Sequence, residues 1–67
     1  MSLITTPNLA DADAVYAELV SAHRGLSEAE SAALNAQLIL ILMNHVGEAG
    51  VLREALALAR REAGPTG

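Results

Sequence analysis

The chain has 67 residues and a mass of 6.9 kDa, which suffices for one small domain and excludes two separate hydrophobic cores. Apolar residues make up 52% of the sequence and cysteine is absent, so packing must stabilise the fold, without disulfides or thiolate metal sites. The formal net charge is −4, with eight acidic residues, four arginines and no lysine, which argues against a basic face for nucleic acid.

Residues 1–8 are expected to form an N-terminal arm, because the Thr-Thr-Pro segment disfavours helix entry, although Leu3 and Ile4 are apolar enough to dock on the body. A first helix is expected to begin near Asn8 or Asp11, either of which can cap free backbone N–H groups. We expect it to stop at Gly25. Its apolar face consists of Ala12, Val15, Tyr16, Leu19, Val20, Ala22 and His23.

The second helix has the clearest start signal of the sequence. Ser27 and Glu30 form a capping box, in which each side chain satisfies a backbone N–H of the other residue. The helix is expected to run to about Val46 and to end at Gly47 in the left-handed conformation. The apolar run Leu38–Met43 is also compatible with a buried strand, but the upstream helix formers and the lack of a pairing strand favour a helix.

A third helix is expected after a tight turn at residues 48–50, ending at about Ala63 before Gly64 and Pro65. The sequence therefore predicts an all-α fold of three antiparallel helices with a central hydrophobic second helix, assembled as a dimeric helical bundle. The single domain is expected to cover residues 9–63, followed by a C-terminal tail at residues 64–67.

The expectation of a dimer comes from the second helix, whose polar stripe is narrow. Glu30, Gln37 and Asn44 recur every seven residues, and almost every other position around the helix is apolar. Two flanking helices cannot cover so wide a surface, so we expect a homo-oligomer, most simply a two-fold dimer. A different protein covering the patch, or a bare monomer, are the alternatives. The expected interface consists of Ala32, Ala36, Ile39, Leu40 and Met43.

Polar residues that interrupt the apolar helix faces are the candidates for chemistry. Each of the two histidines is either a ligand or general base, or a structural residue that binds free carbonyls in the last turn of its helix. Asn35 either fixes the register of a helix pair or bonds to a neighbouring loop. The possible polar site consists of His23, Arg24, Asn35, Asn44 and His45.

No motif in the sequence predicts a catalytic, metal or cofactor site. There is no His-Glu-x-x-His pattern, no glycine-rich loop before a helix and no serine or threonine paired with a base. We therefore expect no enzymatic activity and no cofactor. Metal or small-ligand binding through His23 or His45 at a subunit interface stays an alternative.

The longest apolar run has six residues, far short of the roughly 18 that span a bilayer. Residues 1–10 lack the basic start and apolar stretch of a signal peptide. Tyr16, the only aromatic residue, offers no stacking surface for single-stranded nucleic acid. We expect a cytoplasmic protein without a membrane or nucleic-acid partner.

Three segments carry a resemblance to a known family: the Ala-His-Arg-Gly-Leu-Ser of Ala22–Ser27, the Leu-Asn-Ala-Gln-Leu of Leu34–Leu38 and the Leu-Met-Asn-His-Val-Gly of Leu42–Gly47. Over about Leu9 to Ala59 the chain resembles the domain of unknown function 2783 family of short bacterial proteins. The resemblance implies a bacterial three-helix protein without supplying a reaction. It also implies a second role, as an accessory subunit of a metabolic enzyme such as a flavin-dependent oxygenase.

Overall fold

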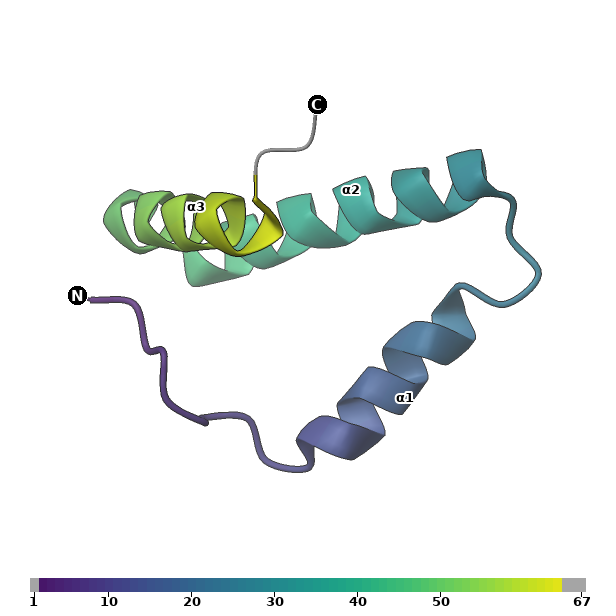
Figure 1. The fold of residues 1–67 in the computed structure, drawn as a ribbon, viewed down its shortest axis with the longest axis horizontal. Helices are drawn as coiled ribbons and strands as arrows, with labels where there is room; N and C mark the ends of the chain where they lie inside the picture. Colours follow the sequence, from purple (N-terminus) through teal and green to yellow (C-terminus); the bar gives the residue numbers. More distant parts are fainter. Residues whose placement is uncertain (1, 65–67) are drawn as a thin grey trace.

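The computed structural model describes residues 2–64, which contain three helices and no strand (Figure 1). Helix α1 spans Ala12–Ala22, α2 spans Glu28–Val46 and α3 spans Ala49–Ala63. The prediction of an all-α fold with three helices is confirmed. The apolar run Leu38–Met43 lies wholly within α2, so it forms no strand. Of the expected C-terminal tail, residues 65–67 lie outside the described residues.

Both ends of α2 follow from neighbouring residues, as expected. The Ser27 hydroxyl oxygen accepts a bond from the Glu30 backbone N–H at 3.1 Å, and the Ser27 backbone N–H donates to Glu30 Oε1 at 2.9 Å. The helix ends at Gly47, whose φ of 66° is left-handed and whose N–H donates to the Met43 carbonyl oxygen at 2.9 Å. These bonds satisfy backbone groups that a helix end leaves free.

Helix α1 begins next to Asp11, as expected, but it differs from the prediction in its capping bond and at its end. Asp11 occupies the N-cap position with a left-handed φ of 53° and makes no capping bond, so the expected side-chain cap is wrong. The helix ends at Ala22 rather than at Gly25. The reason is a tightening of the last turn, in which the N–H groups of His23 and Arg24 donate to carbonyls three residues earlier instead of four.

Helix α3 begins one residue after Glu48 and takes Gly50 into its first turn, so the turn is shorter than expected. The Glu48 carboxylate accepts a bond from the Gly50 N–H at 2.8 Å. A Cβ atom at position 50 would approach Glu48 Oε1 to 3.0 Å, and glycine leaves room for this contact. The helix ends at Ala63, as expected, with Gly64 at a φ of 74°.

The N-terminal arm lies against α3. The Leu3 backbone N–H donates to Glu54 Oε2 at 3.1 Å, across 51 positions of sequence. Leu3 and Thr5 line a shallow depression there with Ala57 and Leu58 of α3. The N-terminal segment therefore begins beside α3 and leads from there to the start of α1, as Figure 1 shows.

No residue between positions 2 and 64 is buried. The three helices do not pack along their lengths, and the radius of gyration is 13.6 Å, whereas a compact chain of this length has about 11 Å. The accessible surface is 5831 Å², against about 4,000 Å² for a compact monomer of this mass. Residues 2–64 therefore form secondary structure without a hydrophobic core.

The capping box predicts a pH dependence for α2. The Ser27 backbone N–H, and then its hydroxyl, hold the pKa of the Glu30 carboxyl below its ordinary value. The stability that these bonds contribute is fully present above the ordinary pKa of 4.5 and is lost as the pH falls through the lowered pKa. We expect the helical circular dichroism signal of Glu30→Gln to lose less on acidification than that of the natural sequence.

Glutamine keeps an acceptor for the Ser27 N–H but does not titrate, so the difference between the two curves isolates Glu30. Ser27→Ala is the matched control for the cap itself, and it is expected to lower stability by about 0.5–2 kcal/mol. Identical acid profiles for the natural sequence and Glu30→Gln would contradict the assignment.

Candidate functional site

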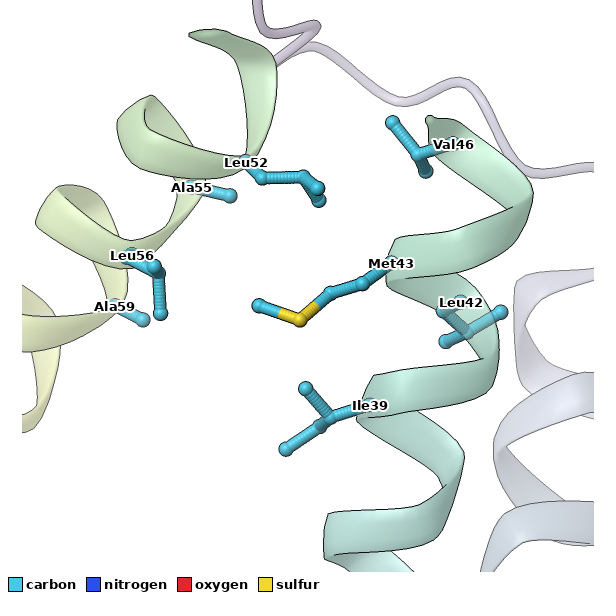
Figure 2. A pocket seen from close by; sticks show the side chains of 8 residues that line it. All are labelled: Ile39, Leu42, Met43, Val46, Leu52, Ala55, Leu56 and Ala59. Atoms are coloured by element: carbon cyan, nitrogen blue, oxygen red, sulfur yellow. The ribbon is translucent and has the colours of Figure 1, made fainter. Parts of the chain in front are cut away.

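An apolar groove runs between α2 and α3, and it is named here the α2–α3 groove. Figure 2 shows Met43 extending from α2 toward Leu52 and Leu56 of α3. The α2 wall consists of Ile39, Leu42, Met43 and Val46. The α3 wall consists of Leu52, Ala55, Leu56 and Ala59. No charged side chain lines the groove, so it offers contact area without any polar group to orient a ligand.

A second groove, the α1–α2 groove, lies on another face of α2. Its α1 wall consists of Val15, Glu18, Leu19 and Ala22. Its α2 wall consists of Leu34, Gln37, Leu38 and Ile41. Since Leu38 and Ile39 project about 100° apart on a helix, α2 presents apolar walls in two directions. Together the grooves use most of the apolar surface of this helix.

The apolar side chains of α2 stay largely open to solvent. Ile39, Leu40 and Ile41 are 52%, 59% and 62% exposed, and Leu42 and Val46 are close to half exposed. The sequence predicted an uncovered hydrophobic patch within one copy, and the structure contains it. Solvent contact at these positions is unfavourable by roughly 25 cal/mol for each Å² that remains in water.

The five expected interface residues divide into two groups. Ile39 and Met43 lie in the wall of the α2–α3 groove. Ala32, Ala36 and Leu40 are exposed and line neither groove. The α3 wall around Leu56 was not assigned to a site from the sequence, although the amphipathic pattern of the third helix shows its apolar side.

Two of the candidate polar residues meet where α1 joins α2. A ring nitrogen of His23, Nδ1, lies 2.7 Å from the Leu19 carbonyl oxygen, and Nε2 lies 2.7 Å from Asn35 Oδ1. Both partners are acceptors, so the charged imidazolium, with two N–H groups, donates to both. The Leu19 carbonyl, and then the Asn35 side chain, raise the pKa of His23 above its ordinary value.

This arrangement gives both residues structural roles. His23 binds a free carbonyl near the end of its helix, and Asn35 bonds to the segment that connects α1 with α2, which was one of the two interpretations of Asn35. The other three candidates, Arg24, Asn44 and His45, make no side-chain hydrogen bond among residues 2–64. No cluster of three or more potential metal ligands occurs in that range.

The sequence was compared with protein-family models, with curated proteins and with solved structures. A protein-family model described as protein of unknown function (DUF2783) matches residues 3–61. No curated protein and no solved structure matches the chain. The match extends beyond the region of Leu9 to Ala59 in which the sequence motifs were recognised. None of the helices in the described range is both long and apolar enough to cross a bilayer.

The bond between His23 and Asn35 predicts an ordered series of histidine pKa values. Asn35→Ala is expected to lower the pKa of His23 because one acceptor is lost, and Asn35→Asp is expected to raise it because a carboxylate replaces the amide. The stability that the two bonds of the charged His23 ring contribute is fully present below the ordinary pKa of 6.5. It is lost as the pH rises through the raised pKa.

Nuclear magnetic resonance titration of the ring protons, in a His45→Ala background that leaves one imidazole, measures this order directly. A midpoint that is the same with alanine, asparagine and aspartate at position 35 would show that the contact does not exist in solution.

Proposed function

We propose that this chain, which belongs to the DUF2783 family of unknown function, is a non-catalytic interaction module whose hydrophobic core forms between copies of itself. The supporting observation is that residues 2–64 contain no buried side chain, while the apolar positions of α2 are about half exposed. A chain without a core cannot offset the conformational entropy lost on folding. Association supplies the missing burial.

The amount of surface supports a permanent assembly. The 5831 Å² exposed by one copy exceeds the area of a compact monomer by roughly 1,800 Å². If two copies remove that excess from water, the interface totals about 3,600 Å², which falls among obligate homodimers and above transient complexes. The simplest form is a two-fold dimer that completes an antiparallel helical bundle around α2.

The proposed interface centres on the exposed face of α2. Ala32 and Ala36 carry small side chains that allow a partner helix to approach closely, and they share one side of α2 with the groove residues Ile39 and Met43. Leu40 lies one helical turn beyond Ala36. This face lacks charged groups, so it can be desolvated without burying an unpaired ion.

The absence of catalysis is part of the proposal, and the His23 geometry supports it. Both of its ring nitrogens already have hydrogen-bond partners within the fold, which leaves no free nitrogen for a substrate. An accessory role on a metabolic enzyme is the alternative, in which the apolar face of α2 meets a different protein. The tests below separate the two, because only self-association depends on the concentration of the purified chain.

The first prediction concerns dilution. If folding and association are coupled, the helical circular dichroism signal and the melting temperature should both fall as the purified chain is diluted. By mass action, a hundredfold dilution lowers the apparent free energy of unfolding of a coupled dimer by about 2.7 kcal/mol. A melting temperature that stays constant across this dilution would contradict the proposal. Sedimentation velocity on the same samples reports the mass.

The second prediction compares two leucines of equal exposure. Leu40 in α2 is 59% exposed, and Leu9, three residues before the start of α1, is 60% exposed. In an isolated copy the substitution Leu→Glu therefore changes the solvation free energy by a similar amount at both positions. We expect Leu40→Glu to dissociate or unfold the assembly, because a carboxylate would be buried without a partner, whereas Leu9→Glu leaves the mass unchanged. Light scattering measures both variants. Equal behaviour of the two would place the interface elsewhere.

A further inference from the structure

We infer that the α2–α3 groove of one copy receives the outer edge of α1 from a second copy, in a reciprocal exchange. This inference rests on the proposed function and adds the identity of the entering segment. The outer edge of α1 is defined by Asp13, Tyr16 and Val20, which share one helix face because they are three and four positions apart. None of the three lines either groove of its own chain.

The outer edge of α1 has the character of an interface. Tyr16 is the only aromatic residue of the sequence and is 66% exposed, and Val20 is 49% exposed one turn further along. Tyrosine is enriched at the energetic centres of protein interfaces because its ring buries a large area with few rotatable bonds. A single aromatic side chain left outside any core therefore marks the side of α1 that meets another surface.

The α2–α3 groove matches that edge in size and polarity. It measures about 290 Å³, at the lower limit of pockets that hold small molecules, and it is open along its length. Such a groove suits the apolar side of a helix, whose side chains enter from one direction at positions spaced three and four apart. Leu56, on the rim of the groove, is itself 57% exposed.

Charge sets the direction of α1 in the proposed contact. Arg53 and Arg60 lie three residues before and four residues after Leu56, so helix geometry places both beside the rim of the groove on α3. Asp13 lies in the first turn of α1 on this edge, whereas Arg24 follows Val20 by four residues, just beyond the end of the helix on the same side. We therefore place the N-terminal end of α1, which carries Asp13, beside Arg53 and Arg60, and a two-fold axis repeats the pairing in the second groove.

The absence of cysteine makes this arrangement directly testable by cross-linking. Chains with Val20→Cys are mixed with chains carrying Leu56→Cys and a mass tag, and the mixture is oxidised mildly. We expect a disulfide-linked mixed dimer, because a disulfide forms only when the two Cα atoms come within about 7 Å. Glu18→Cys in place of Val20→Cys is the matched control, since Glu18 faces the α1–α2 groove of its own chain, and its yield should be several-fold lower.

A charge exchange provides an independent measurement in the uncross-linked protein. The double variant Arg53→Glu, Arg60→Glu should weaken dimer formation about two- to fivefold, and adding Asp13→Arg should recover part of the loss. The effect should shrink at high salt, because exposed ion pairs are screened.

The outcomes separate this inference from the proposed function. If sedimentation shows a dimer but Val20→Cys links no better than the Glu18→Cys control, the assembly stands and the placement of α1 is wrong. If the chain is a folded monomer at all concentrations, both the proposed function and the placement are wrong. A preferential Val20 to Leu56 link together with recovery by Asp13→Arg supports the exchange.

Discussion

The apolar circumference of α2 is the constraint on which the rest of the molecule depends. A helix that presents Leu38 and Ile41 in one direction and Ile39 and Met43 in another needs neighbours on more than one side. The chain supplies α1 and α3, but neither covers its side closely enough to bury a residue. Local bonds therefore determine where the helices begin and end, and within residues 2–64 no buried side chain adds to them.

The parts of the fold that depend on adjacent residues could be predicted from the sequence. Ser27 and Glu30 determined the start of α2, and Gly47 determined its end, because each acts through bonds that span four residues or fewer. At α1 the predicted start near Asp11 is confirmed, but the predicted end and capping bond were wrong. Its last turn tightened before Gly25, and Asp11 adopted a left-handed backbone in place of a capping one, which an aspartate tolerates better than most residues.

The candidate site depends on long-range geometry, and the sequence predicted it only in part. The apolar positions of α2 were recognised from their periodicity, whereas the α3 wall at Leu56 and the contact of His23 with Asn35 required the angles between helices. Those angles depend on single hydrogen bonds across linkers, such as the bond between His23 and Asn35, and such bonds leave no periodic signal. Asn35 illustrates this limit, since its two interpretations differed only in which element lay next to it.

The bond between Leu3 and Glu54 connects the N-terminal segment to α3, across 51 positions of the sequence. Leu3 lies nine positions before Ala12, the first residue of α1, and an extended segment of that length reaches at most about 30 Å. While the bond holds, the segment between Leu3 and Ala12 limits the distance between the start of α1 and α3. Removal of the first few residues would release that restraint without changing any helix. The orientation of α1 relative to α2 would then depend on residues 23–27, which connect the two helices.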